Sequence, residues 1–531
     1  MFTKHSLPLK NTSLFSGLFN DYINAKDHLT PFYEFHINKQ AYQAFIEKNK
    51  FESVNRGVLT KALDRQAKLV ENTHPATWAN ITLLENTNTY SVTTGHQLCL
   101  FTGPLYFIYK IISTINLAKT LSAQFPGKDF VPVYWMASED HDFEEINHIH
   151  VFGKKVTWNS PQKGSVGEFS TEGLKDVIAE LKTILGESDH ANTMIRLFEN
   201  AYVNHSNLAD ATRYLVNELF GAYGLIILDG NDKDLKHLFK QEFKKDIFEN
   251  NAFTAVNTSI GQLKTNYSIQ VNPREINAFY KEHQLRERIE KEGDNYKVVN
   301  TGITFSKKEL ENLIETSPEK LSPNVVLRPL YQQQILPNIA YVGGPGEIAY
   351  WLEYKLLFES YGITFPILMP RNFVMLMDKG TQTKLQKLNL TTEDTFKEGE
   401  ELVKQFIRTH NDVSLEDAKA RLNDIYASIL ETVSAIDKTI AGTTEAEKQK
   451  SINGLSNIEQ KINRSLKQKS ETDINQIWGI KGKLFPNNVP QERHDNFSMY
   501  FTKYGNAFIP ELMTQLTYTL SDFNYTVLSD N

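Results

Sequence analysis

Three short segments of this chain gather residue types that bind anions, transfer protons or hold a cation. The first is Thr94-Gly95-His96-Gln97, followed by Thr102-Gly103 just ahead of a helical stretch. Backbone amides at a helix start attract anions, and glycine lets a phosphate or carboxylate approach the chain closely. We therefore expect an anion-binding turn in which His96 donates a hydrogen bond to a phosphate. The alternative is an ordinary strand-to-helix turn with a structural histidine.

The second segment is Glu139-Asp140-His141-Asp142, which ends the apolar run 130–137 and is followed by Glu144, Glu145, His148 and His150. Carboxylates and imidazoles serve as general bases, as acceptors for sugar hydroxyls or as ligands of a hard cation. The spacing matches no zinc signature. A solvated acidic turn is the alternative.

The third segment, Gly343-Gly344-Pro345-Gly346-Glu347, formally contains a dinucleotide fingerprint that extends to Ala349. Proline at the second position of this motif, and no acidic residue at the end of the following predicted strand 365–369, argue against NAD. We interpret the segment as an anion-binding loop with Glu347 as a candidate base. No P-loop motif occurs in the sequence.

Two arginines are flanked by prolines near predicted strand ends, Arg328 in Leu327-Arg328-Pro329 and Arg371 in Pro370-Arg371-Asn372. A guanidinium there can bind a carboxylate or phosphate through two parallel hydrogen bonds. Surface ion pairing is the alternative for each.

The elements that must position these segments alternate between strand and helix. Apolar runs predict strands at 89–93, 130–137, 224–230, 339–342 and 365–369, with helices over 105–125, 207–223 and from the glycine loop to 361. This alternation is typical of a doubly wound α/β fold with a parallel sheet, where ligands bind at the carboxyl ends of the strands. Residues 1–88 show helical periodicity and predict a helical lead-in.

Beyond Asp378 the pattern becomes that of long helices. Apolar residues repeat at alternating spacings of four and three at Leu422, Tyr426, Ile429, Val433, Ile436 and Ile440. Gly442 interrupts this seam, and Leu455, Ile458, Ile462 and Leu466 resume it. We predict an antiparallel coiled-coil hairpin; amphipathic helices packed on the core are the alternative. The predicted domains are a core over 1–378, a coiled-coil domain over 379–480 and a segment 481–531 that returns to the core.

Composition narrows the classes of partner. The formal charge is −7 over 531 residues with both signs interspersed, which leaves no broad basic surface for nucleic acid. The single cysteine, Cys99, excludes an internal disulfide and a thiolate zinc cluster, and we read it as a small buried residue. Apolar stretches long enough for a signal peptide or a membrane span are missing from the sequence. We expect a soluble, cytoplasmic protein that binds neither membrane nor nucleic acid.

Four ordered runs together resemble the BshC family of bacillithiol-synthesis cysteine ligases. They are TTGHQLCLFTGPLYFIYKIISTINLAK, VPVYWMASEDHDFEEINH, LRPLYQQQILPNIAYVGGPGEIAYWLEY and LFPNNVPQER. The resemblance implies a Rossmann-like core with connecting inserts, a coiled coil that forms a homodimer, and addition of L-cysteine to the amine of glucosaminyl malate. Where many relatives carry glutamine, this chain has His96.

The core is also similar to class I aminoacyl-tRNA synthetases and nucleotidylyl transferases. By that analogy ATP activates the cysteine carboxylate, most simply as an adenylate, so ATP or ADP is the expected nucleotide and Mg²⁺ the candidate companion ion.

The resemblance also suggests a role for each segment. Phosphate or the acyl-phosphate centre would be held by the first turn, through Gly95, His96, Gln97, Thr102 and Gly103, with Thr94 beside them. Sugar hydroxyls or the amine would meet Asp140, His141 and Asp142, next to Glu139, with His141 or Asp140 as the general base. The pocket would be completed by Gly343, Gly344 and Glu347, and the malate carboxylates would be bound by Arg328 or Arg371. A nucleotide outside the main pocket would contact Asn487, Asn488, Gln491 and Arg493.

Two other classes of function stay open from the sequence. One is a metal-dependent hydrolase that uses Asp140, His141, Asp142 and His148. The other is a non-catalytic nucleotide-binding scaffold that assembles through the coiled coil.

Overall fold

The chain divides into two compact units. The computed structural model describes residues 1–49, 51–410, 415–521 and 523–531. Unit 1 comprises Met1–Met375 and Gln491–Leu528, and unit 2 comprises Leu376–Pro490 and Ser529–Asn531. The central sheet belongs to unit 1, and most of unit 2 is helical.

The core of unit 1 is a five-stranded parallel sheet in the order β13-β12-β2-β3-β6. Its strands are β2 (Thr89–His96), β3 (Asp129–Met136), β6 (Ile226–Asp229), β12 (Asn338–Gly343) and β13 (Ile367–Pro370). Their residues are almost all buried, as in parallel sheets covered by helices on both faces. The chain runs outward from β2 to β6, then returns to β12 on the other side of β2. The strand order therefore reverses between β2 and β12, where α/β folds bind ligands, and the doubly wound prediction is confirmed.

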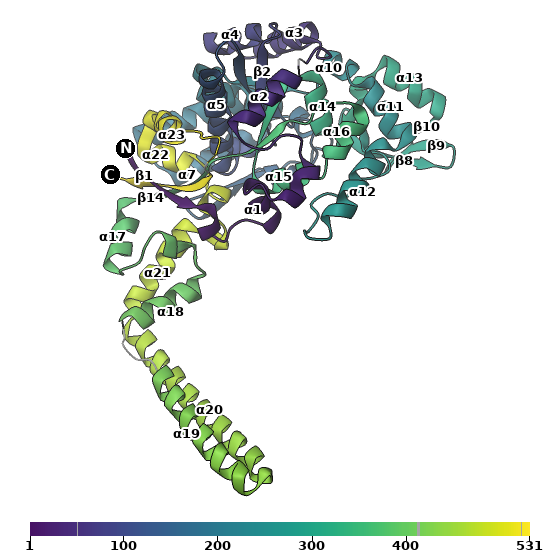
Figure 1. Cartoon of the computed structure of the whole chain (residues 1–531). Helices are drawn as coiled ribbons and strands as arrows, with labels where there is room; N and C mark the ends of the chain where they lie inside the picture. The colour runs from purple at the N-terminus through teal and green to yellow at the C-terminus, as the bar shows by residue number, and fades with distance from the viewer. Residues whose placement is uncertain (50, 411–414, 522) are drawn as a thin grey trace. The chain divides into compact units, whose positions relative to one another are not determined.

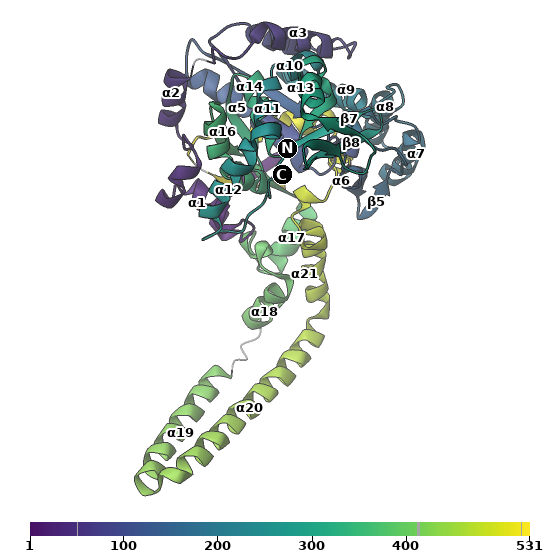
Figure 2. The ribbon, with the colours of Figure 1, turned by 90° about the vertical axis from the view of Figure 1, so that its right-hand side faces the viewer.

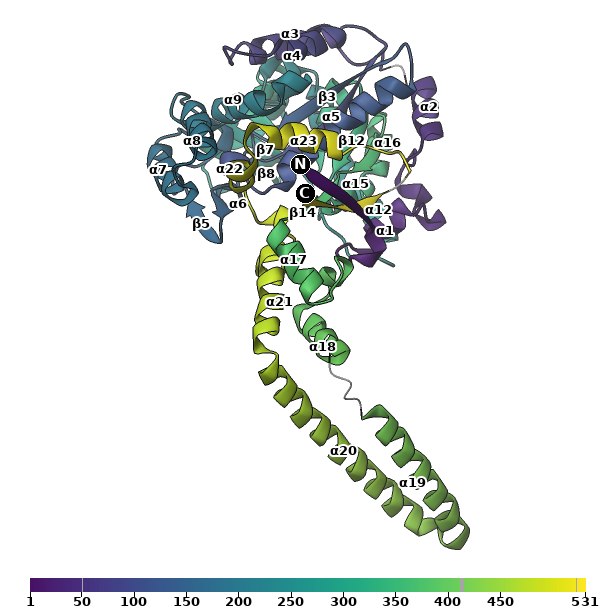
Figure 3. The same cartoon turned by 90° about the vertical axis from the view of Figure 1, so that its left-hand side faces the viewer.

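Helices cover this sheet (Figure 1). Helix α5 (Tyr106–Gln124) follows β2 and buries nearly its whole surface, because its sequence is apolar on most sides. Figure 3, turned by 90° from Figure 1, shows α5 beside β3. The other long helices of unit 1 are α7 (Leu174–Leu185), α8 (Asp189–Tyr202), α9 (Leu208–Phe220), α11 (Lys240–Glu249), α12 (Asn251–Leu263), α13 (Lys307–Thr316) and α14 (Leu327–Ile335).

A second sheet, which the sequence reading did not predict, is inserted between α12 and α14. It is antiparallel, in the order β10-β9-β8-β7-β11, with β7 (Ala278–Glu282), β8 (Leu285–Glu292), β9 (Asn295–Val298), β10 (Thr304–Ser306) and β11 (Leu321–Pro323). Strand β8, Leu-Arg-Glu-Arg-Ile-Glu-Lys-Glu, is mostly charged and only partly buried. Such a strand lacks the apolar run that identifies a buried strand, which explains why it was missed.

Two predicted elements differ in the structure. The amino-terminal lead-in begins with a strand, β1 (Phe2–Pro8), before helices α1 (Gly17–Ile23), α2 (Lys39–Lys48), α3 (Arg56–Ala67) and α4 (Pro75–Leu83). The helix expected to run to residue 361 is broken into α15 (Pro345–Leu352) and α16 (Lys355–Tyr361). At the break lies buried Glu353, whose carboxylate accepts the backbone N–H of Gln270 at 2.8 Å and of Val271 at 3.3 Å.

Within unit 2, α19 (Glu416–Ile436) and α20 (Lys438–Lys469) lie side by side as a hairpin (Figure 2). Contacts between Lys419 and Glu459 and between Tyr426 and Ser451 run in opposite directions along the two helices, which confirms the antiparallel prediction. The predicted break at Gly442 is wrong. The chain turns at Asp437, whose carboxylate caps α20 by accepting the Thr439 N–H at 2.8 Å. Helices α17 (Lys379–Lys387), α18 (Gly399–His410) and α21 (Glu471–Leu484) complete unit 2.

Across the residues that the structure describes, every helix is too short or too polar to cross a membrane.

Candidate functional site

A pocket of about 760 Å³ lies in unit 1 at the carboxyl ends of the central strands. Turns after β2, β3, β12 and β13 form one side, and the inserted antiparallel sheet contributes the other. Of the residues singled out in the sequence, the pocket is lined by Gly95, His96, Gln97, Glu139, Asp140, His141, Arg328, Gly344, Glu347, Arg371 and Arg493. The parallel sheet therefore brings together three segments that are far apart in the sequence.

His96 ends β2 with its imidazole pressed against aromatic rings. The ring lies 5.0 Å from Phe107 and 5.3 Å from Tyr106, and its Nε2 is buried without a hydrogen-bond partner among the described residues. Burial, reinforced by the nearby Lys110 and Arg371, lowers the pKa of His96 to about 3. The imidazole is therefore neutral at physiological pH, and it can offer a ligand a hydrogen bond but no charge.

Lys110 of α5 holds the first turn and the third segment together. Its side chain is 2% exposed, and its Nζ donates to the Gly95 carbonyl at 2.5 Å and to Glu347 Oε2 at 2.8 Å. Glu347 also accepts the Tyr341 hydroxyl and the Gly344 N–H. Lys110 is not among the site residues predicted from the sequence, although a lysine inside an otherwise apolar helix is a signal that could have identified it.

These contacts disfavour the role of general base predicted for Glu347. Burial raises the pKa of the carboxyl, but Lys110, the Gly344 amide and Tyr341 outweigh burial and hold the pKa below its ordinary value. A carboxylate in an ion pair with a buried ammonium group is a poor proton acceptor. Glu347 instead fixes the glycine loop as a capping residue at the start of α15.

In the acidic turn, the carboxylate of Asp140 lines the pocket and accepts the backbone N–H of His141 at 2.7 Å and of Asp142 at 3.4 Å. The Gln97 amide donates to Asp140 Oδ2 at 2.9 Å and to Glu145 Oε2 at 2.7 Å, which links the first two segments. His141 Nδ1 lies 2.5 Å from Arg286 Nη1, and since arginine only donates, Nδ1 accepts and the neutral ring carries its proton on Nε2. Burial and then Arg286 lower the pKa of His141. Neither ring nitrogen is therefore a free base in this arrangement.

The charge of Glu139 is neutralised by an ion pair with Lys236. Lys236, fully buried, donates to Glu139 Oε1 and to the Leu321 carbonyl, each at 2.7 Å. Burial lowers the pKa of Lys236 to about 8, although Glu139 opposes that shift. We therefore assign Glu139 a structural role in the acidic turn.

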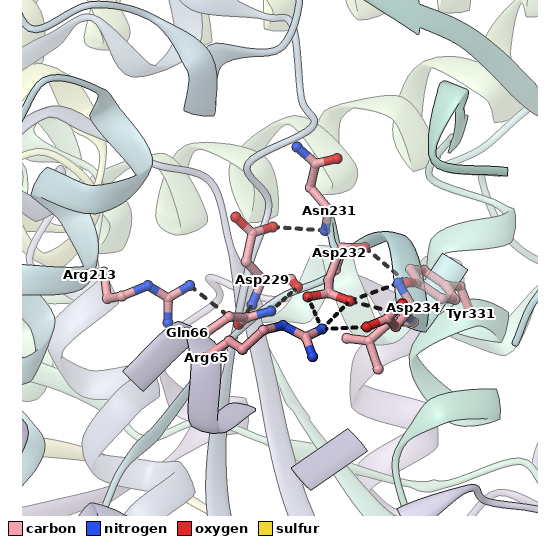
Figure 4. A network of polar contacts seen from close by, with 10 residues as sticks. Arg65, Gln66, Arg213, Asp229, Asn231, Asp232, Asp234 and Tyr331 are labelled. Carbon is pink, nitrogen blue, oxygen red and sulfur yellow. Dashed lines mark hydrogen bonds and ion pairs between the residues drawn. The ribbon is translucent and has the colours of Figure 1, made fainter. Parts of the chain in front are cut away.

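The end of β6 supports the same turn (Figure 4). Ser138 donates to the carboxylate of Asp229, which also accepts the Asn231 N–H at 2.9 Å. Gln66 exchanges two hydrogen bonds with the backbone of Asp229, and Arg213 donates to the Gln66 side-chain oxygen at 3.3 Å. Side chains from α3 and α9 thus fix the segment beside Glu139 and Asp140.

Arg371 does not have the free guanidinium that malate recognition requires. It forms two parallel hydrogen bonds with Glu492, at 2.8 Å and 2.7 Å, and the two side chains are 2% and 3% exposed. Arg328 differs. Its Nη1 donates to Gln332 at 2.9 Å, while its Nη2 is buried without a partner among the described residues.

Several other predicted site residues have structural positions. Thr94 is fully buried and donates to the Val342 carbonyl at 2.8 Å, so it joins β2 to β12 and does not face the pocket. Thr102 is buried, and Gly103 has a φ of 68°, where an added Cβ would lie 2.5 Å from Cys99 Cβ. Asp142 caps the short helix α6 (Phe143–Ile146), and Gly343 accepts the Arg371 N–H at 2.9 Å. None of these five residues lines the pocket.

Cys99 is buried, as expected, and burial raises its pKa to about 12. A thiol with that pKa is not a nucleophile at neutral pH. Asn487 and Asn488 belong to unit 2, and their contact with a nucleotide stays a prediction.

The four residues predicted as ligands of a hydrolytic metal ion do not all line the pocket. Asp140 and His141 line the pocket, whereas Asp142 caps α6 and His148 Nδ1 lies 2.9 Å from Asn147 Oδ1. Across the described ranges, no three His, Cys, Asp or Glu side chains are grouped so that they could hold a metal ion. The geometry therefore does not support the metal-dependent hydrolase.

Comparison with known proteins agrees with the architecture. Residues 2–372 match the model described as "Bacillithiol biosynthesis BshC, N-terminal Rossmann-like domain", and residues 374–528 match "Bacillithiol biosynthesis BshC, C-terminal coiled-coil domain". A Flavobacterium psychrophilum protein named "Putative cysteine ligase BshC" is 43% identical over 512 residues, covering 96% of each chain. A Bacillus cytotoxicus protein of the same name is 30% identical over 532 residues, covering 96% of this chain and 98% of its own. With its Rossmann-like sheet, its helical hairpin and this full-length similarity, the chain belongs to the BshC family of bacillithiol biosynthesis.

Proposed function

We propose that this protein is a ligase that joins the carboxyl group of L-cysteine to the amine of glucosaminyl malate. Family membership supports the reaction class, and the relatives' printed name, cysteine ligase, supports the amino acid. The observation that supports the proposal is the pocket at the switch point, where the Asp140 carboxylate lines the same cavity as Arg328 and His96, each with a buried nitrogen that has no partner among the described residues.

Different groups in this pocket suit different parts of the two reactants. Forming the amide requires the sugar amine to lose a proton as it attacks the cysteine carbonyl carbon, and Asp140 is positioned to accept that proton. The malate carboxylates need a cation, and Arg328 has a free nitrogen whereas Arg371 is paired with Glu492. The activated carboxylate fits the Gly95–Gln97 turn, where His96 Nε2 can donate.

The residues at this turn also fit a nucleotide. An added Cβ on Gly95 would lie 3.3 Å from the Tyr341 hydroxyl and 3.5 Å from Arg328 Nη1, so glycine keeps this turn less crowded than another residue would. ATP, when bound, would supply the activation that makes the cysteine carboxylate reactive. Mg²⁺ in nucleotide enzymes uses one or two carboxylates together with phosphates, and Glu145, which accepts a hydrogen bond from Gln97, would provide one.

We also propose a homodimer formed through the coiled coil. Isoleucines on α19 and α20 are strongly exposed, among them Ile425 at 56% and Ile458 at 51%. A partner copy would cover apolar surface that is costly to leave in water.

The direct test is synthesis by the purified protein. We expect a product with the mass of bacillithiol from cysteine, glucosaminyl malate and ATP with Mg²⁺, and no product with the Asp140→Asn variant. Deleting the gene should abolish bacillithiol and cause glucosaminyl malate to accumulate in cells, measured by thiol labelling and mass spectrometry. Tight nucleotide binding without product, together with unchanged thiol pools, would instead support the scaffold.

A further inference from the structure

The inserted sheet and the loop before it contribute three arginines to the pocket, Arg274, Arg286 and Arg288. Their capacity to bind a ligand differs. Arg286 donates to Ser322, His141 and the Pro323 carbonyl, and Arg288 pairs with Glu290 at 2.9 Å. The guanidinium of Arg274 has no hydrogen-bond or ion-pair partner within the described part of the chain. Arg274 and Arg328 are thus two arginines of the pocket that have guanidinium N–H groups without a partner among the described residues.

A buried side chain anchors the backbone of Arg274. Asn277, 1% exposed, accepts the Arg274 N–H through Oδ1 at 3.1 Å and donates from Nδ2 to the Arg274 carbonyl at 2.8 Å. Asn277 is itself fixed by Asp246 of α11, whose two carboxylate oxygens accept its backbone N–H at 2.6 Å and its Nδ2 at 3.0 Å. Asp246 is fully buried.

The same asparagine fixes the start of the helix that carries Arg328. Asn324 Nδ2 donates to Asn277 Oδ1, and the Asn324 N–H donates to the Asn277 carbonyl, each at 3.0 Å. Asn324 then accepts the N–H groups of Val326 and Leu327 through its side chain and that of Arg328 through its carbonyl, at 2.9 Å for Arg328. The backbones of two arginines from separate elements are therefore held by one hydrogen-bonded relay, Asp246–Asn277–Asn324, in which Asp246 and Asn277 are buried.

We propose that Arg274 and Arg328 form a subsite for a small dianion, the dicarboxylate of the malate group, and that Asp246 and Asn277 are its positioning residues. This inference rests on the proposed function for the identity of the dianion. A relay that fixes the backbone of both arginines before the ligand arrives reduces the ordering cost of binding. A nucleotide phosphate is the other anion that two arginines would bind, and the test separates the two.

The test measures binding of malate and of ADP to the full-length protein by calorimetry at low ionic strength. We expect Arg274→Gln and Arg328→Gln each to weaken malate binding at least tenfold and to change ADP binding less than twofold. Arg274→Lys should recover part of the affinity. Arg196→Gln, on the exposed face of α8 and outside the pocket, is the matched control and should bind malate as the unaltered protein does.

The positioning role is tested by Asp246→Asn, which replaces one acceptor oxygen by a donor and leaves both arginines in place. We expect KM for glucosaminyl malate to rise several-fold while KM for cysteine is unchanged, in protein whose melting shows that it is folded. Should Asp246→Asn fail to fold, Asn324→Ala tests the Arg328 branch of the relay with the same readout.

The outcomes distinguish this inference from the function on which it rests. Unchanged malate affinity in Arg274→Gln, or an equal loss of malate and ADP affinity, overturns the dicarboxylate subsite even if the enzyme makes bacillithiol. Malate binding that depends on both arginines in a protein that makes no bacillithiol supports the subsite and refutes the ligase.

Discussion

At the scale of single residues, some charges of the pocket are neutralised by another residue of the protein, and others are left to bind a ligand. Lys110 with Glu347, Lys236 with Glu139 and Arg371 with Glu492 are buried pairs. A buried charge without a counter-charge is costly in free energy. Each residue of these pairs is therefore needed to neutralise its partner. Asp140 lines the pocket outside these pairs, and Arg328 has a guanidinium nitrogen without a partner among the described residues, so we place the chemistry on these two.

The first prediction separates Asp140 from its neighbour Asp142. Asp140→Ala should lower kcat by roughly 10²–10⁴-fold, the usual contribution of a general base. Asp142→Ala removes a helix cap and should cost about 1 kcal/mol of stability with turnover retained. Steady-state rates and denaturant unfolding of both variants measure this difference. Equal loss of turnover in the two would argue that the whole turn, and not Asp140, is responsible.

The second prediction concerns pH and His96. Because the folded-state pKa is about 3 and the unfolded value about 6.5, the unfolded state binds the extra proton first. The stability due to the neutral ring is present above pH 6.5 and is lost as pH falls toward 3, which amounts to about 2 kcal/mol at pH 5. His96→Gln should unfold less readily between pH 6.5 and 3 and retain activity at neutral pH. The same acid sensitivity in both proteins would contradict the assigned burial.

At the scale of elements, the short segment 491–493 is tied to the end of β13. Glu492 accepts two hydrogen bonds from Arg371 and the Val374 N–H at 3.1 Å, all in a buried environment. The segment thereby holds Arg371 against the pocket without leaving it free for substrate.

The third prediction follows from this pair. Glu492→Gln leaves the Arg371 charge buried and uncompensated, which should cost about 3–5 kcal/mol in the free energy of unfolding. The double variant Arg371→Met, Glu492→Met should recover much of that loss, because no buried charge remains. Asp64→Asn breaks the exposed pair with Lys68 and should cost well under about 1 kcal/mol. Denaturant titration measures all three, and a neutral Glu492→Gln would show that the pair is not buried in solution.

At the scale of the whole molecule, the exposed isoleucines of the hairpin lead to the fourth prediction. Ile425→Lys with Ile458→Lys should convert a dimer into a monomer, measured by sedimentation equilibrium. Both side chains are exposed in the single chain, so helicity by circular dichroism should be unchanged. Glu431→Lys, an exposed polar position of α19, is the matched control and should leave the dimer intact. A monomeric unaltered protein would refute the proposal.

The sequence by itself determined the parallel α/β core, the helical hairpin and the meeting of three glycine-rich or acidic segments at one edge of a sheet. These follow from local periodicity, because strand and helix repeats and the turns between them are written in neighbouring residues. The departures have equally local causes. The turn at Asp437 in place of Gly442 reflects a capping carboxylate that outweighs a glycine tolerated inside α20.

Only the tertiary structure decided which charges face the pocket unpaired. Lys110, Lys236 and Glu492 lie 237, 97 and 121 residues from the partners that they neutralise. Arg274 comes from a loop beside a charged antiparallel sheet without an apolar signature. Pairing across such separations depends on how the strands are ordered and on what each buried charge meets there, and no local pattern of residue types encodes that choice.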